Sequence, residues 1–453
     1  MPRHAMAKII SFNAEMIDIC ASAARISTTE GNALDIFCDA HKKNNNMDLI
    51  GKVLKSGHNS LLEHAVFCIA FNEVSVFVEQ YIIESRLASF TVKSRRYVNY
   101  SNQGYYIPPE LNKENADKYQ RYMQILFDGY AQLIELGVPK EDARFLLPYS
   151  FCSNMYCTIN ARELLQLLSS ILYGRGSRFP ELVDIAKQLI SQINELFPVM
   201  LNHLVEKKVA TDLQHTNRLK TNERHELVRF LTPTELGNIE IIQAPLKPLD
   251  LLSFAYSISH PCASSEFDII SILSDSRPRE LEQLNYTFSI SPITLAGLTH
   301  LVRHRMQSII IPPLTQAHSH LFVLPESISN SAAALGIYQR IIEKAAIYRA
   351  EYEKNEQLAE YQYYYTLSGN VIDVMTTMNA RELQHFMMLR SCNRAQWEIR
   401  TISMNMLFAL QNHFPALFSH YGPSCVMQNH CPEGELSCGQ INQVRKAFSR
   451  LEQ

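Results

Sequence analysis

The pattern of apolar and polar positions predicts strands mixed with long helices. Residues 65–78 read "AVFCIAFNEVSVFV", an apolar stretch rich in Val, Ile and Phe that is typical of a strand. A basic segment, a long amphipathic helix and a proline-marked connection, "YYIPPEL" at 105–111, complete this half of the chain. Further helices are predicted to begin near "NARELLQLLSSIL" and near "NARELQHFMMLR". This mixture indicates an α+β fold rather than a doubly wound parallel sheet.

The chain repeats itself at a constant offset. The pentapeptide "NAREL" occurs at 160–164 and again at 379–383, which is 219 positions later. The same offset relates residues 64, 85 and 89 to residues 283, 304 and 308, in segments that are otherwise only loosely similar. Because these correspondences hold one register over a long stretch, we expect a tandem duplication.

Length and prolines indicate where the two copies divide. A chain of 453 residues is too long for one hydrophobic core, so two domains are expected. Prolines cluster in "PTELGNIEIIQAPLKPLD" at 233–250, which we interpret as a linker. The first domain is then predicted at 1–232 and the second at 251–453.

Composition narrows the class of protein. Hydrophobic residues make up 46% of the chain and charged residues 19%, as in ordinary globular proteins. The net charge of −3 does not favour a nucleic-acid binder, and apolar runs are broken before membrane-spanning length. The first residues lack the apolar core of a signal peptide. Ten scattered cysteines favour reduced thiols, so we expect a cytoplasmic protein that binds neither nucleic acid nor membranes.

A group of cysteines and histidines lies in the C-terminal tail. Cys425, Cys431 and Cys438 occur there with His420 and His430, and these residue types are the ligands of tetrahedral zinc. Their spacing of five and six intervening residues is longer than the two to four that structural zinc sites use. We therefore expect free thiols and no metal, with a zinc site as the alternative.

Several segments together resemble one enzyme family. They are "GHNSLLEH", "SRLASFTVKSRRYV" and "YYIPPEL" in the first half, and "RHRMQS" and "NARELQHFMMLRSCNRAQWEIR" in the second. These stretches are similar to the flavin-dependent thymidylate synthases. The signature of that family is Arg-His-Arg, two residues, Ser, one residue, Asn-Glu, one residue, Ser, one residue, Arg. The resemblance covers most of both halves, so the chain resembles two family domains fused in tandem.

The resemblance implies a specific reaction. Family members are α+β homotetramers that bind FAD and dUMP between subunits. They transfer a methylene from methylenetetrahydrofolate to uracil C5, with NADPH as reductant and no protein nucleophile. Arginine guanidinium groups suit the phosphate and flavin oxygens of such ligands. Since each chain supplies two family domains, a homodimer that imitates the tetramer is expected.

The first half keeps only part of the family signature. Its Arg-His-Arg has become Glu84-Ser85-Arg86, and its Asn-Glu has become Thr91-Val92. The end of the signature survives as Ser94 and Arg96. An upstream family arginine survives as Arg144, whereas the arginine of the last helix is replaced by Ile171.

The second half keeps the other part. Arg303, His304 and Arg305 are present, as is the last-helix arginine, Arg390. The Ser-x-Arg end is replaced by "PLT" at 313–315, Asn-Glu has become Ile310-Ile311, and Tyr363 stands at the position of Arg144.

The two sets of losses are complementary. In the family, one subunit supplies the Ser-x-Arg segment and the upstream arginine, and another supplies Arg-His-Arg and the last-helix arginine. Pairing the two halves would therefore assemble one nucleotide site from Ser94, Arg96, Arg144, Arg303 and Arg390. The reciprocal set of Glu84, Ile171, Thr315 and Tyr363 lacks the groups that bind a phosphate.

The resemblance also assigns roles. Ser94 and Arg96 would bind the nucleotide phosphate with Arg144 nearby, and Arg390 would hydrogen-bond the uracil and stabilise charge on the ring. The FAD ligands would be Arg303, His304, Arg305, Asn379 or Asn160, Arg381 or Arg162, and His64. Structural alternatives are a surface charge for Arg96, an interhelical salt bridge for Arg390, a charged helix end for 303–305, helix N-caps for both asparagines, and a core histidine for His64.

Two classes of function remain open at this point. The first is FAD-dependent C5 methylation of a uridine nucleotide, either dUMP or another pyrimidine nucleotide. Loss of Asn-Glu from both halves favours the second, a non-catalytic relative that binds nucleotide or flavin. Retention of complementary segments favours the enzyme, since drift without selection would erode both sites.

Overall fold

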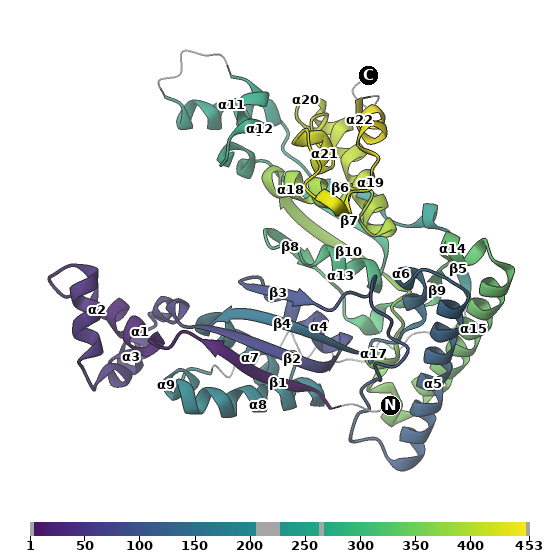
Figure 1. Ribbon diagram of the computed structural model, residues 1–453, viewed down its shortest axis with the longest axis horizontal. Coiled ribbons are helices and arrows are strands. Elements are labelled where there is room, and N and C mark those ends of the chain that lie inside the picture. Colours follow the sequence, from purple (N-terminus) through teal and green to yellow (C-terminus); the bar gives the residue numbers. More distant parts are fainter. Residues whose placement is uncertain (1–3, 205–226, 262–266, 450–453) are drawn as a thin grey trace. The chain divides into compact units, whose positions relative to one another are not determined.

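The computed structural model describes residues 4–204, 227–261 and 267–449 (Figure 1). They form two compact units: unit 1 contains residues 4–134, 147–204 and 347–366, and unit 2 contains residues 135–146, 227–261, 267–346 and 367–449. Each unit combines one largely antiparallel sheet with helices, so the predicted α+β class is confirmed. Within the described ranges, no helix has the length and apolar character needed to cross a membrane.

Unit 1 is built on a four-stranded antiparallel sheet in the order β1-β2-β4-β3. Its strands are β1 (Met6–Phe12), β2 (Val66–Ser75), β3 (Ala88–Val92) and β4 (Cys152–Asn160). The helices are α1 (Met16–Arg25), α2 (Ala33–His41), α3 (Asn46–Lys55), η1 (Asn59–His64), α4 (Val76–Ile83), α5 (Lys113–Glu135), α7 (Ala161–Tyr173), α8 (Pro180–Leu196), α9 (Pro198–Leu201), α16 (Glu356–Ala359) and α17 (Gln362–Tyr365).

Unit 2 has a six-stranded sheet in which β5-β9-β10-β7-β6 run in order and β8 pairs with β10. Its strands are β5 (Arg229–Leu231), β6 (Asn238–Gln243), β7 (Asn285–Thr294), β8 (Gln307–Ile310), β9 (His318–Val323) and β10 (Asn370–Asn379). Its helices include α6 (Lys140–Ala143), η2 (Arg144–Leu146), η3 (Pro233–Glu235), α11 (Pro248–Ser259), α12 (Ile269–Ser274), η4 (Arg279–Gln283), α13 (Leu295–Leu301), η5 (Leu314–Gln316), α14 (Glu326–Ser329), α18 (Ala380–Arg390), α19 (Trp397–His413), α20 (Pro415–Phe418), α21 (Ser424–Met427), η6 (Gly434–Leu436) and α22 (Ile441–Ser449). The long helix α15 (Ala332–Lys354) begins in unit 2 and ends in unit 1.

The sequence repeat is also a repeat of strand pairing. In unit 1, Val66 of β2 pairs with Asn160 of β4; in unit 2, Asn285 of β7 pairs with Asn379 of β10. Both partners are 219 residues further along, as the sequence offset predicts. Since pairing register decides which side chains face the core, β2 and β4 of unit 1 correspond residue by residue to β7 and β10 of unit 2.

The segment expected to be a linker is part of the second sheet. Residues 238–243 form β6, in which Asn238 pairs with Ser291 of β7. In unit 1, Met6 of β1 pairs with Asn72, the residue that corresponds to Ser291. Thus β6 occupies in unit 2 the place of β1 in unit 1, and the stretch 233–250 contains the strand that corresponds to β1.

The two copies also exchange equivalent segments. Residues 135–146 of the first repeat belong to unit 2, and residues 347–366 of the second repeat belong to unit 1. In unit 2, Asp142 accepts hydrogen bonds from Ser327 Oγ at 2.6 Å and from Trp397 Nε1 at 2.7 Å. In unit 1, Tyr352 donates its hydroxyl to the carbonyl of Lys118 at 2.6 Å. Each unit is therefore completed by residues from the other repeat.

The apolar run at 65–78 changes from strand to helix inside its length. The strand β2 ends at Ser75, whose Oγ accepts from Val78 N at 3.1 Å, while Glu181 Oε1 accepts from Ser75 N at 2.7 Å. Unit 2 repeats this corner with Thr294, which caps α13, and Glu398, which accepts from Thr294 N at 2.6 Å. A cap and a buried carboxylate satisfy the free backbone donors, which outweighs the β-propensity of the following valines.

The buried carboxyl of Glu181 makes the stability of unit 1 depend on pH. Burial raises the pKa of Glu181 from 4.5 to about 7, although hydrogen bonds from Ser75 and Tyr364 oppose the shift. The folded state therefore holds this proton more tightly than the unfolded state, and the free energy of unfolding falls as pH rises from about 4.5 to about 7.

We expect Glu181→Gln to remove this loss, which is on the order of 3 kcal/mol. Chemical denaturation between pH 5 and pH 8 measures it, with Glu195→Gln on the exposed face of α8 as the control. An equal loss of stability with rising pH in Glu181→Gln and in the unsubstituted protein would contradict this account.

Candidate active site

The basic triplet 303–305 follows directly on the C-terminus of α13. The helix ends at Leu301, whose carbonyl accepts from His304 N at 3.2 Å. Arg303 and Arg305 are exposed, whereas His304 between them is buried. The triplet therefore lies where the interpretation as a charged helix end places it, because cations interact favourably with the negative, C-terminal end of the helix dipole. That interpretation does not account for the buried histidine.

His304 lies between a carboxylate and a guanidinium. Its Nδ1 is 3.0 Å from Glu382 Oε1, and Arg390 Nε donates to its Nε2 at 3.0 Å. Since a guanidinium only donates, Nε2 must accept, which leaves the proton on Nδ1 of a neutral ring. Burial lowers the pKa of His304 below 6.5 and the charge of Arg390 lowers it further, while Glu382 opposes both. The ring therefore acts as a neutral relay between Glu382 and Arg390 near pH 7.

Arg144 joins this group from the first repeat. Its Nη2 is 3.3 Å from His300 Nε2, and Arg390 Nη2 donates to the His300 carbonyl at 3.1 Å. We call Arg144, His300, His304, Glu382 and Arg390 the arginine cluster. Arg144, His300, His304 and Glu382 are buried and Arg390 is half-buried. Two guanidinium groups held in this way are suited to an anionic or carbonyl-bearing ligand.

The corner before α13 holds His300 in place. Thr294 Oγ1 accepts from Gly297 N at 2.8 Å and donates to Glu398 Oε2 at 2.5 Å. A Cβ atom on Gly297 would lie only 2.7 Å from the Glu398 carboxylate, so a side chain there would displace α13 from α19. This close approach fixes the helix that carries His300.

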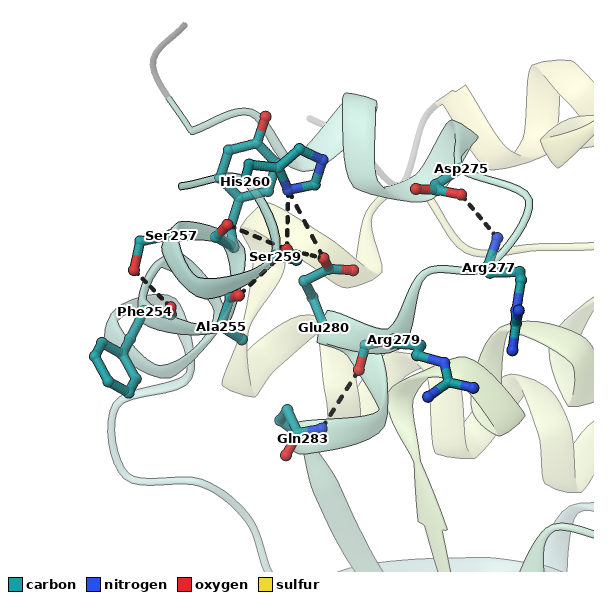
Figure 2. A network of polar contacts seen from close by, with 11 residues as sticks. Phe254, Ala255, Ser257, Ser259, His260, Asp275, Arg277, Arg279, Glu280 and Gln283 are labelled. Atoms are coloured by element: carbon teal, nitrogen blue, oxygen red, sulfur yellow. Dashed lines mark hydrogen bonds and ion pairs between the residues drawn. The ribbon is translucent and has the colours of Figure 1, made fainter. Parts of the chain in front are cut away.

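A cavity of about 900 Å³ adjoins the arginine cluster. Its lining includes Met306, Arg381, His385 and Met388, and it also includes Glu382, which the cavity shares with the cluster. Residues 273–276 and 278 form another part of the lining. Figure 2 shows the supports of that segment: Asp275 accepts from Arg277 N at 2.8 Å, and Glu280 interacts with Ser259 at the end of α11.

The two copies of "NAREL" have the same local structure. Asn160 and Asn379 cap α7 and α18 by accepting from the backbone N–H three residues later, at 2.9 Å and 2.8 Å. Arg162 forms an ion pair with Glu63, and Arg381 forms one with Glu282. Both asparagines are therefore helix N-caps, and Asn379 and Arg381 also line the cavity.

His64 and the Ser94–Arg96 loop lie in unit 1. His64 ends η1 and is exposed, so the interpretation as a core histidine does not hold. Ser94 and Arg96 follow β3, where Ser94 Oγ accepts from Arg96 N at 3.2 Å. Both side chains are half-buried.

Unit 1 has aromatic packing where unit 2 has the arginine cluster. Tyr81, Ser85 and Ile171 stand at the positions of His300, His304 and Arg390, and Tyr363 stands at that of Arg144. The ring of Tyr363 lies 4.6 Å from that of Phe77 and 4.5 Å from that of Phe179, and Ile171 is fully buried. Aromatic rings or an aliphatic side chain thus stand at three of these four positions, and Ser85 stands at the fourth.

Sequence reasoning did not identify His300 and Glu382 as site residues. His300 lies in the last turn of α13, three residues before Arg303, so its nearness in the chain to the basic triplet was the available signal. Glu382 belongs to the repeated pentapeptide and was counted only as a marker of the duplication.

The cysteines of the tail gather near one another. Burial raises the pKa of the Cys425 thiol, and Cys392, Cys431 and Cys438 lie near enough to raise it further. The nine cysteines of the described ranges are free thiols. Across those ranges, no three His, Cys, Asp or Glu side chains are placed to hold a metal ion.

Comparison with known proteins finds the same family twice along the chain, once in each repeat. The profile of the family described as "Thymidylate synthase complementing protein" matches residues 8–199 and again residues 262–416. The chain belongs to the flavin-dependent thymidylate synthase family. The two matched regions fit a tandem duplication of the family domain.

Individual relatives each match less than half of this chain. The flavin-dependent thymidylate synthase of Geobacter sulfurreducens is 31% identical over 189 residues, which are 40% of this chain and 79% of that protein. The flavin-dependent thymidylate synthase of Saccharolobus solfataricus is 28% identical over 202 residues, which are 43% of this chain and 75% of that protein. The UMP/dUMP methylase PolB of Streptomyces cacaoi is a similar solved structure, with a TM-score of 0.38, 22% identity and coverage of 44% and 94%.

The position of His304 predicts its titration. We expect the ring to titrate below its ordinary value of 6.5 and to be neutral at pH 7, because it is buried beside Arg390. Glu382→Gln should lower the midpoint further, since the carboxylate is the neighbour that favours the charged ring. NMR of histidine-labelled protein, with His304→Asn to assign the signal, measures both midpoints. A His304 midpoint above 6.5 would show that this arrangement is wrong.

Proposed function

We propose that the protein catalyses FAD-dependent C5 methylation of a uridine nucleotide, dUMP to dTMP, with methylenetetrahydrofolate and NADPH as co-substrates. One observation carries this proposal: unit 2 assembles an arginine cluster from both repeats beside a large cavity. The flavin cofactor and the class of reaction are inferred from membership of the family.

The cavity suits the flavin cofactor. Arg381 and His385 would face the phosphate groups, and the side chains of Met306 and Met388 offer soft apolar surface for the flavin ring system. A cavity of about 900 Å³ lies in the range of sites for large ligands. Bound flavin supplies the redox chemistry, while these residues bind it and orient it. Of the two "NAREL" copies, we assign cofactor binding to Asn379 and Arg381.

The nucleotide would be held by residues of both repeats. Ser94 and Arg96 would bind the phosphate together with Arg144 and Arg303, as the complementary losses of the two halves imply. Arg390 would donate to the uracil and stabilise negative charge as C5 becomes nucleophilic. Its Nε is already held by neutral His304, so its remaining donors are oriented before the ligand binds.

The assembly follows from the duplication. Each chain supplies two family domains, so two chains would provide the four domains of the family tetramer. We propose a homodimer with one competent nucleotide site for each pair of repeats. The aromatic packing around Tyr363 supports this count, because it fills the positions that the second site would need.

A second candidate function rests on the missing Asn-Glu pair. Thr91-Val92 and Ile310-Ile311 stand in its place, and neither pair offers a carboxylate. This departure favours either a non-catalytic nucleotide- and flavin-binding relative or an enzyme acting on another pyrimidine nucleotide.

The assignment of the flavin to the second repeat predicts different effects at equivalent arginines. Arg381→Ala should abolish the visible flavin absorbance of the purified, FAD-supplemented protein, because it removes a cation from the cavity. Arg162→Ala is the matched control, since that residue makes the equivalent ion pair on α7. Flavin lost from Arg162→Ala and kept by Arg381→Ala would reverse the assignment.

Tritium release from [5-³H]dUMP tests the reaction itself. The FAD-loaded protein with methylenetetrahydrofolate and NADPH should release tritium, and Arg390→Ile should lower the rate by about a hundredfold because a donor to the developing charge is lost. Arg400→Ile, at an exposed position of α19, is the control. Flavin and dUMP binding without tritium release would instead favour the non-catalytic relative.

A further inference from the structure

Unit 1 contains a fully buried ion pair that the proposed reaction does not use directly. Arg95 Nη2 contacts Glu79 Oε1 on α4, and the two side chains are 5% and 0% exposed. The second carboxylate oxygen of Glu79 and the Nε of Arg95 are buried without a hydrogen-bond partner. Burying two charges with part of their hydrogen bonding unsatisfied carries a desolvation penalty that the ion pair must offset.

Arg95 lies between the two residues assigned to the nucleotide phosphate. Its side chain is buried and its guanidinium lies 5.5 Å above the ring of Phe151, while Ser94 and Arg96 on either side are partly exposed. The loop is also held by its backbone, because Lys93 N donates to the Asn154 carbonyl at 3.0 Å and Tyr100 donates to the Lys93 carbonyl at 3.2 Å. Arg95 is thus the side chain that ties the middle of the loop to the core.

The second repeat provides an internal comparison. Leu298 and Leu314 stand at the positions of Glu79 and Arg95, and Leu298 is completely buried in α13. The corresponding helix of the second repeat therefore forms with a buried leucine in place of Glu79, and Leu314 at the position of Arg95 is half-buried. Apolar replacements of buried ion pairs are often neutral or stabilising, so stability does not explain why the first repeat keeps the charges. The repeat that keeps the pair is the one that keeps Ser94 and Arg96.

We propose that the Glu79–Arg95 pair is a positioning device for the phosphate-binding loop. By fixing Arg95 in one geometry, Glu79 sets the backbone from which Ser94 and Arg96 project, so that these groups are ordered before the nucleotide binds. This inference rests on the proposed function, because it takes Ser94 and Arg96 as phosphate ligands. Glu79 and Arg95 act through the loop and touch no ligand themselves.

The double variant Glu79→Leu with Arg95→Leu copies the second repeat and tests the role. We expect a folded protein that binds FAD normally and has a dissociation constant for dUMP raised at least about tenfold. Affinity for deoxyuridine, which lacks the phosphate, should be unchanged, and a general structural defect would not spare it. The control is Arg349→Leu with Glu353→Leu, which removes an ion pair of α15. This control should leave dUMP affinity unchanged.

Calorimetric titration of the FAD-loaded proteins separates the outcomes. If the double variant binds dUMP as tightly as the unsubstituted protein does, the positioning role is wrong, while the proposed function stands. Equal weakening toward dUMP and deoxyuridine also overturns the positioning role. An unsubstituted protein that binds neither ligand overturns the proposed function and this inference with it. If the double variant does not fold, Glu79→Gln keeps the shape and removes the charge, and the same comparison of dUMP with deoxyuridine decides.

Discussion

The candidate site depends on one set of contacts: Glu382 is hydrogen-bonded to His304, and His304 is hydrogen-bonded to Arg390. A guanidinium that is half-buried needs acceptors, and a neutral imidazole supplies one only if its other nitrogen is held as a donor. Glu382 provides that hold from the first turn of α18, the helix that Arg390 ends. The helix α18 therefore carries both Glu382 and Arg390, and His304, which follows α13, lies between their side chains. Without this arrangement, the Nε of Arg390 would lose the acceptor that orients it.

Duplication explains how such a costly arrangement coexists with an ordinary core. Of two equivalent sites in one chain, a single one can satisfy function, and the other is then free to become apolar. We propose that unit 1 has taken this course around Tyr363, whose ring packs at a tilt against Phe77 and edge-to-face against Phe179. Because of the segment exchange, Arg144 lies beside His300 in unit 2, although its sequence belongs to the first repeat.

The sequence predicted those features that depend on local pattern or on internal comparison. The α+β class, the duplication and the family follow from apolar periodicity, from a constant offset and from motifs that survive in part. The strand β6 was missed because "NIEIIQ" lies among prolines, and its partner β7 is distant in sequence. The end of β2 at Ser75 was missed because it is decided by Glu181, 106 residues later. The segment exchange and the contact between Arg144 and His300 are also tertiary facts, which no local pattern encodes.

The central claim is that complementary decay has left one nucleotide site for each pair of repeats. Isothermal titration calorimetry, in which dUMP is added to FAD-loaded protein of known chain concentration, measures the number of nucleotide sites for each chain directly. The account predicts one dUMP bound for each 453-residue chain. Two bound for each chain would show that the aromatic packing of unit 1 still leaves a working site, and would contradict the account.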